Sequence, residues 1–203
     1  MVSNKPQPAA LVLHQVRLGF FQPQTQPLSL QLAQGARIAL TGPNGSGKSL
    51  LLKAVVGQAR VFSGQLTFGQ GIRPTLLAQE HPRPTPWPLS GADWFAAMQT
   101  QPPEHPDVEK LLTRRLDRIS GGQWQLLRLA ACVAEHATPA EQRLLLLDEP
   151  ANHLDAATRD TAIDLLHQLP AMATVLMTSH DAAFLSRLPV EEQPIHALAE
   201  IHE

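Results

Sequence analysis

Apolar residues recur at two different spacings along the chain, and together these spacings predict a mixed α/β fold. Residues 11–20 (LVLHQVRLGF) alternate in part between apolar and polar, which is typical of a half-buried strand. Residues 36–40 (ARIAL) form a short apolar run stopped by Thr-Gly-Pro, which predicts a buried strand. The consecutive leucines of residues 144–147 are apolar on both faces, as in a central parallel strand covered by helices.

Two stretches have the spacing of helices. Residues 49–57 (SLLLKAVVG) are mostly good helix formers and end at Gly57, a residue typical of the position just after a helix. Residues 117–135 (DRISGGQWQLLRLAACVAE) predict a longer helix, in which apolar side chains recur at intervals of three and four. These apolar side chains are Leu126, Leu129 and Val133. Between the two helices, proline-rich stretches at 80–90 and 100–106 interrupt regular structure.

Composition limits the function classes. A chain of 203 residues is long enough for one sizeable core. The formal net charge of −2 gives no reason to expect a nucleic-acid partner. A single cysteine, Cys132, excludes an intrachain disulfide, and no apolar run reaches the roughly 18 residues of a membrane span. The start (MVSNKPQPAA) lacks the apolar segment of a signal peptide, so we expect a cytoplasmic protein that reaches a membrane only through a partner.

The stretch TGPNGSGKS, residues 41–49, lies between a predicted strand and a predicted helix. This is the context that a G-x-x-x-x-G-K-[ST] phosphate loop requires. Its glycines let backbone N–H groups approach phosphate oxygens, and the following helix presents its N-terminus to the anion. Lys48 can reach the terminal phosphates, and the Ser49 hydroxyl can bind Mg²⁺. The alternative is a chance match, which the strand-to-helix context disfavours.

Two carboxylates follow the leucine-rich strand. Asp148 at its end is placed to hold Mg²⁺ through water, and Glu149 can accept a hydrogen bond from an attacking water. The alternative is a charged turn after a core strand. Ser120, Gly121 and Gly122 open the longer helix and predict a second anion cradle, although such glycines also occur in plain loops. One ATP needs one phosphate loop, so a second cradle would serve the nucleotide of a second copy.

These residues carry a family resemblance. The chain resembles an ATP-binding cassette (ABC) ATPase, the nucleotide-binding subunit of an ABC transporter. GPNGSGKS is similar to the Walker A motif, LLAQEH to the Q-loop and ISGGQ to the signature motif. LLLLDEP is similar to Walker B with the catalytic glutamate, ANHLD to the D-loop and MTSHD to the switch-histidine loop. The motifs stand in the family's order and extend over nearly the whole chain.

The resemblance implies a fold and an organisation. We expect a single ABC ATPase domain, residues 1–203, with a P-loop NTPase core at 1–80 and 120–203. The core would hold a mostly parallel sheet flanked by helices, together with an antiparallel N-terminal β subdomain. A short helical subdomain would occupy 81–119.

The resemblance also implies roles in a head-to-tail dimer that closes over two ATP molecules. Glu149 would orient the attacking water, His180 would contact the γ-phosphate, and Lys48 and Gln79 would complete the catalytic set. Mg²⁺ would be held by Ser49, Gln79 and Asp148. The expected nucleotide-binding residues are Phe20, Gly42, Pro43, Asn44, Gly45, Ser46, Gly47, Lys48, Ser49, Leu50, Ser120, Gly121, Gly122, Gln123 and Asp155. A histidine near a strand end is often purely structural, but the MTSHD context of His180 favours the functional interpretation.

Aromatic residues raise two questions. The family stacks adenine mostly on a tyrosine, which this chain lacks, so Phe20, with Phe21 second, is the predicted substitute. Trp87, Trp94 and Phe95 belong either to an exposed site for a membrane subunit or to a small hydrophobic core.

The chain also departs from the family pattern. It has Leu126 and Ala131 where the family commonly has arginine. Its tail after His180 leaves room for a helix at 181–188 and one short strand near 195–201.

The expected partners follow from the resemblance. They are a second copy or a paralogous cassette, the integral membrane permease subunits and, through these, a substrate-binding protein. The protein would lie on the inner face of the cell membrane. The chain looks most similar to importer ATPases for zinc or manganese and for cobalamin or siderophores, which favours a metal ion or metal chelate as cargo. The alternatives are a soluble ABC protein of the translation-factor type, suggested by NHLD, and a catalytically silent module.

Overall fold

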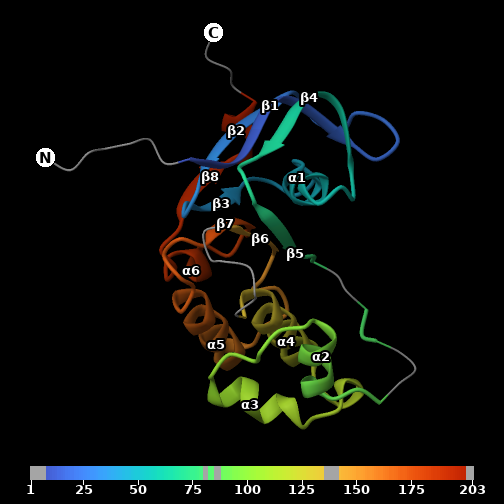
Figure 1. Cartoon of the computed structure of the whole chain (residues 1–203), viewed down its shortest axis with the longest axis vertical. Helices are drawn as coiled ribbons and strands as arrows, with labels where there is room; N and C mark the ends of the chain where they lie inside the picture. Colours follow the sequence, from blue (N-terminus) through green and yellow to red (C-terminus); the bar gives the residue numbers. More distant parts are fainter. Residues whose placement is uncertain (1–7, 80–81, 85–87, 135–141, 200–203) are drawn as a thin grey trace, which may run out of the picture.

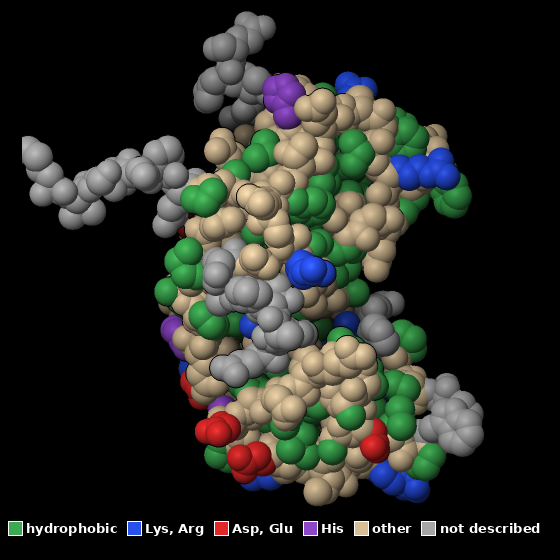
Figure 2. Space-filling model, in the orientation of Figure 1, with side chains coloured by type: hydrophobic (Ala, Val, Ile, Leu, Met, Phe, Trp, Pro, Cys, Tyr) green, Lys and Arg blue, Asp and Glu red, His purple; other side chains and the backbone are tan. Residues whose placement is uncertain are grey.

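Two sheets and a group of helices form the protein (Figure 1). The computed structural model describes residues 8–79, 82–84, 88–134 and 142–199. The first sheet is antiparallel and three-stranded, with the order β2 (Leu28–Ala33), β1 (Ala9–Gly19), β4 (Arg60–Phe68). Its outer strand β4 is largely exposed, and the corresponding upper part of the molecule shows hydrophobic side chains at its surface (Figure 2).

The partial alternation of β1 has a structural cause. Leu11 and Leu13 are buried, whereas further along the strand Val16 and Leu18 are buried instead. The register shifts between these two pairs, and Gln15 has a positive φ of 54°. An extra residue in one strand moves every later side chain to the opposite face of the sheet. The β-bulge at Gln15 therefore keeps Val16 and Leu18 on the same buried face as Leu11 and Leu13.

The second sheet is parallel and five-stranded. Its order is β5 (Arg73–Leu77), β6 (Arg143–Asp148), β7 (Thr174–Thr178), β3 (Arg37–Thr41), β8 (Glu191–Pro194). Every residue of β6 and β7 is buried. The leucine run therefore forms an interior parallel strand, as the sequence predicts.

Alternate residues of β6 face two different cores. Leu144 and Leu146 pack with helix α1 (Lys48–Val55) and the antiparallel sheet. Leu145 and Leu147 pack with the helices on the other face of the parallel sheet. These helices are α4 (Gly121–Val133), α5 (Ala156–His167) and α6 (Ala182–Leu185). The strand is thus apolar on both faces because both faces are covered.

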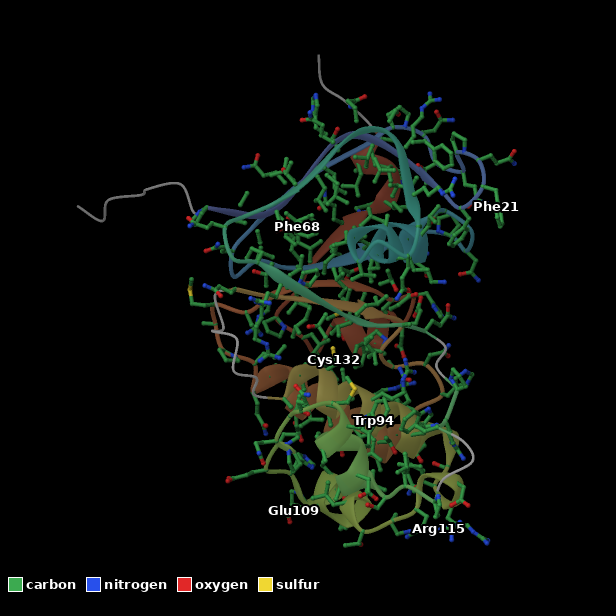
Figure 3. The ribbon with its side chains drawn as sticks, turned by 45° about the vertical axis from the view of Figure 1, so that its right-hand side comes forward. Phe21, Phe68, Trp94, Glu109, Arg115 and Cys132 are labelled. Carbon is green, nitrogen blue, oxygen red and sulfur yellow. The ribbon has the colours of Figure 1, made fainter. Side chains whose placement is uncertain are left out.

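A small helical group packs against α4. It consists of α2 (Gly91–Ala97), α3 (Pro106–Leu112) and the 3-10 turn η1 (Leu116–Arg118). Trp94 lies in its interior (Figure 3), with its ring 4.8 Å from that of Trp124 in an edge-on arrangement. Phe95 is 2% exposed. Of the two alternatives, the small hydrophobic core therefore holds for Trp94 and Phe95, while Trp87 lies outside the described residues.

The tail differs from its prediction. The last strand of the described residues is β8 at Glu191–Pro194. Of the residues expected to form a strand, 195–198 instead form the 3-10 helix η3 (Ile195–Leu198), and 200–201 lie outside the described residues. Ile195 and Leu198 are both buried, and their three-residue spacing places them on one side of such a helix. The helix expected at 181–188 covers only α6, which Asp181 caps by accepting from the Phe184 N–H at 2.9 Å. No helix within the described ranges has the length and hydropathy to span a bilayer.

Candidate nucleotide-binding site

The phosphate loop joins the end of β3 to the first residue of α1. Gly47 precedes the helix with a φ of 97°, a left-handed conformation that glycine adopts without strain. A Cβ at Gly47 would also stand 3.0 Å from the methyl group of Thr25. Thr25 is held in turn because its hydroxyl accepts from the Leu18 N–H at 2.9 Å. The loop between β1 and β2 therefore supports the phosphate loop from the side.

A cavity of about 450 Å³ opens beside this loop. Its lining residues are Gln24, Asn44, Gly45, Ser46, Gly47, Lys48, Ser49, Leu50, Gln79, Glu149 and His180. The hydroxyl of Ser46 is buried and has no hydrogen-bond partner among the described residues. The start of a helix, an ammonium group and an unpaired hydroxyl together form a site suited to a phosphate chain.

Lys48 is held over the loop by backbone oxygens. Its Nζ donates to the carbonyls of Gly42 at 2.8 Å and Pro43 at 3.0 Å, and the residue is 6% exposed. The ammonium is thus fixed within the loop without a carboxylate partner among the described residues. Phosphate oxygens would offer it stronger, charge-assisted hydrogen bonds than these neutral carbonyls.

Asp148 joins three elements at the end of the parallel sheet. Its Oδ1 accepts from the Ser49 hydroxyl and from the Thr178 hydroxyl, both at 2.7 Å. Asp148 is 1% exposed, so this carboxylate is desolvated and depends on these donors. A hydroxyl, a carboxylate and the nearby Gln79 amide are oxygen donors of the kind Mg²⁺ prefers, and Mg²⁺ commonly completes its shell with water and substrate phosphate. The residues present therefore fit a magnesium ion.

Glu149 follows Asp148 with a left-handed backbone, at a φ of 50°. Its N–H donates to the carbonyl and hydroxyl of Thr178, at 3.1 and 3.0 Å, which hold this uncommon conformation. The side-chain Oε1 lies 3.0 Å from His180 Nδ1. Glu149 is buried whereas the His180 side chain is 65% exposed. The predicted catalytic pair is thus in contact at the wall of the cavity.

The signature residues lie elsewhere. Ser120 caps α4: its hydroxyl accepts from the Gln123 N–H at 3.1 Å, and its own N–H donates to Gln123 Oε1 at 3.0 Å. A Cβ at Gly121 would meet no atom within 4 Å, whereas one at Gly122 would lie 2.9 Å from the His153 carbonyl oxygen. None of the residues Ser120–Gln123 lines the phosphate cavity. One chain therefore does not bring its own signature motif to its own phosphate loop.

Asp155 acts here as a helix cap. It begins α5 and accepts from the Thr158 N–H at 2.8 Å. The backbone hydrogen bond from Thr158 lowers the pKa of this exposed carboxyl group below its usual value. The predicted link between two nucleotide sites across a dimer stays a prediction.

The aromatic predicted to stack on adenine does not line the cavity. Phe20 is 40% exposed, and Phe21, at the outer end of the β1–β2 loop (Figure 3), is 95% exposed. Gln24, in the same loop, does line the cavity and was missed by sequence reasoning. No motif marks Gln24, because its position depends on how this loop folds back on Leu18 through the Gln24 N–H, at 2.8 Å.

A parallel sheet whose carboxyl ends carry a glycine loop, a fixed lysine and a Ser–Asp pair defines a P-loop nucleotide hydrolase. Comparisons narrow this class. The ABC transporter family model matches residues 25–85. The vitamin B12 import ATP-binding protein BtuD of Citrobacter koseri is 35% identical over 76% of this chain and 70% of its own length. The zinc import ATP-binding protein ZnuC of Marinobacter nauticus is 32% identical over 83% of this chain and 67% of its own length.

Solved structures agree in fold. A putative ABC transporter ATP-binding protein from Pyrococcus furiosus has a TM-score of 0.73 at 18% identity, over 95% of this chain and 100% of its own. An inward-facing putative metal-chelate type ABC transporter has a TM-score of 0.68 at 26% identity, over 93% of this chain and 80% of its own. The chain belongs to the ABC transporter ATP-binding family and is an ATP-binding ATPase subunit of that family. The resemblance to importer ATPases is confirmed, and the translation-factor alternative is not favoured.

Proposed function

We propose that the chain hydrolyses ATP as one half of a head-to-tail dimer and thereby drives import through membrane permease subunits. The observation that supports this is the separation of two phosphate-binding halves. The cavity holds Lys48, Ser49, Glu149 and His180, whereas the signature motif beginning at Ser120 presents its first glycine to open space. A second copy turned by 180° would offer its signature motif to this cavity.

Each residue has a chemical task in this proposal. The phosphate-loop backbone and Lys48 bind and orient the phosphates. Ser49, Gln79 and Asp148 would hold a magnesium ion, which would supply positive charge to neutralise the phosphate oxygens. Glu149 accepts a hydrogen bond from the attacking water and so polarises it, while His180 keeps Glu149 in place and faces the terminal phosphate. Phosphoryl transfer depends mainly on such positioning and charge stabilisation, so a single chain with half a site should turn over slowly.

The proposed site is tested by trapping the dimer. Glu149→Gln keeps the size of the side chain but removes the charge that polarises water, so ATP binding should persist, turnover should stop and a dimer should accumulate with ATP. Light scattering measures the dimer, and phosphate release measures turnover. Wild-type turnover by Glu149→Gln would contradict the assignment of Glu149.

Two serines supply a matched pair for the dimer arrangement. Ser120 caps α4 and Ser90 caps α2, each through a capping box. In the Glu149→Gln background, Ser120→Arg should abolish ATP-driven dimerisation, because a long cation would occupy the interface. Ser90→Arg removes an equivalent cap and should leave dimerisation intact. Equal dimerisation of both variants would contradict the head-to-tail arrangement.

We further propose that the cargo is a metal ion or metal chelate and that the chain works at the inner face of the cell membrane. Two relatives, a vitamin B12 import protein and a zinc import protein, support this class of cargo. The tagged chain, recovered from detergent-solubilised membranes, should bring one multi-span membrane protein with it. Recovery of ribosomal proteins instead would contradict the transport role. Cells lacking the chain should contain less of one transition metal, and an unchanged metal content would contradict the cargo class.

A further inference from the structure

The signature helix α4 contains a buried cation that its sequence pattern does not explain. Ten consecutive residues, Trp124 to Val133, are buried, and all except Gln125 and Arg128 are apolar or thiol side chains. Arg128 and Gln125 are each 5% exposed. Burial lowers the pKa of Arg128, and no carboxylate of the described residues forms an ion pair with it. Burying a guanidinium group in this way is costly, so its contacts matter.

The contacts of Arg128 run from the helix to the start of the Q-loop. Its Nη2 donates to the carbonyl of Ala78, which belongs to the peptide bond leading to Gln79. Its Nη1 donates to Gln125 Oε1 at 2.7 Å, one helical turn earlier. The guanidinium fork thus ties the residue before the predicted magnesium ligand to the interior face of the signature helix.

Gln125 extends the connection to the catalytic turn. Its Nε2 donates to the carbonyl of Pro150, the residue after Glu149, at 3.4 Å. Arg128 therefore contacts the residue next to Gln79, and Gln125 contacts the residue next to Glu149. The same helix starts at Ser120, where a partner copy is expected to bind.

We propose that Arg128, acting through Gln125, is a positioning residue that holds Gln79 and Glu149 in register with the signature motif. If α4 rotates when a partner copy binds, Gln79 and Glu149 move with it, because the hydrogen bonds from Arg128 to Ala78 and from Gln125 to Pro150 both start on this helix. This inference rests on the proposed roles of Gln79 and Glu149.

The test compares Arg128→Met with Arg143→Gln in the full chain. Arg143 is 6% exposed and donates to the carbonyl of Cys132 at the far end of the same helix, so it is a matched buried arginine away from both arms. Arg128→Met should lower kcat by about 10- to 100-fold, the effect of misplacing reacting groups by about 1 Å. It should also raise the Mg²⁺ concentration for half-maximal turnover, with ATP affinity of the monomer within about twofold of wild type, since the phosphate loop is untouched. Arg143→Gln should lower the melting temperature but leave kcat and the Mg²⁺ requirement unchanged.

Two further variants keep the inference testable if Arg128→Met does not fold. Gln125→Met removes the arm to Pro150 and the acceptor of Arg128 Nη1, but it leaves the bond from Arg128 Nη2 to the Ala78 carbonyl. Its kcat should therefore fall, while its Mg²⁺ requirement should rise less than that of Arg128→Met. Arg128→Lys keeps the charge but offers a compact ammonium in place of a fork, so its kcat should be intermediate. The inference is overturned if these variants match Arg143→Gln in kcat and Mg²⁺ dependence. Turnover that survives Glu149→Gln would instead overturn the proposed function, whatever Arg128 does.

Discussion

Two adjacent glycines of the signature motif should respond to alanine in opposite ways. A methyl group at Gly121 would meet nothing within 4 Å, whereas at Gly122 it would lie 2.9 Å from the backbone oxygen of His153. Alanine in place of glycine favours a helix by about 0.5–1 kcal/mol. Gly121→Ala should therefore stabilise the free chain by up to this amount. Gly122→Ala must push the D-loop away, and overpacking of this kind costs about 1–3 kcal/mol.

Urea unfolding of the nucleotide-free chain measures the difference. With a slope of about 2 kcal/mol per M, the two midpoints should differ by about 1 M, and Gly121→Ala should have the higher one. The second assay is ATP-driven dimerisation in the Glu149→Gln background. There Gly121→Ala should bind its partner less well despite its greater stability, because the added methyl group stands where the partner's nucleotide is expected. Equal urea midpoints would refute the close approach to His153, and undiminished dimerisation by Gly121→Ala would refute the assignment of its open side.

Two other predictions concern buried side chains. Phe95→Ala should destabilise the protein by about 3–5 kcal/mol and lower its melting temperature by about 10 °C. Phe21→Ala, at a 95% exposed position, should change the stability by less than about 0.5 kcal/mol. Similar melting temperatures for the two variants would contradict the small core. Burial raises the pKa of the Cys132 thiol to about 12, so this thiol should not react with a disulfide reagent at pH 8 until urea unfolds the chain. Since the folded pKa lies above the unfolded one, the stability of wild type relative to Cys132→Ala should fall as the pH rises from 9.0 toward about 12.

Sequence reasoning locates those features of the fold and of the candidate site that depend on neighbours in the chain. The phosphate loop needs glycines, a lysine and a serine within one strand-to-helix turn, so its residues are visible as a motif. The interior strand is visible because both of its faces are covered and every position must be apolar. The cap at Ser120 is likewise a local feature, since its partner Gln123 is three residues away.

It fails where a role depends on contacts between distant segments. Gln24 reaches the cavity only because its loop folds back beside Gly47. The bulge at Gln15 reverses a facing pattern that the sequence shows only as imperfect alternation. Trp94 is in the small core because Trp124 lies across from it, which no spacing within residues 81–119 reveals.

Arg128 combines both kinds of information, because its place in the helix is visible in the sequence whereas its contacts appear only in the folded chain. When positions are compared one by one, the missing arginines raise the question of what supports the local packing and coupling of the signature helix. In the folded chain, however, a guanidinium three residues after Gln125 lies between the Q-loop start and the catalytic turn. A cation at position 128 projects from a different side of α4 than one at 126, since each helical residue turns the side chain by about 100°. An arginine at 126 would therefore point away from the Ala78 carbonyl, and the proposed arms toward Gln79 and Glu149 depend on position 128 itself.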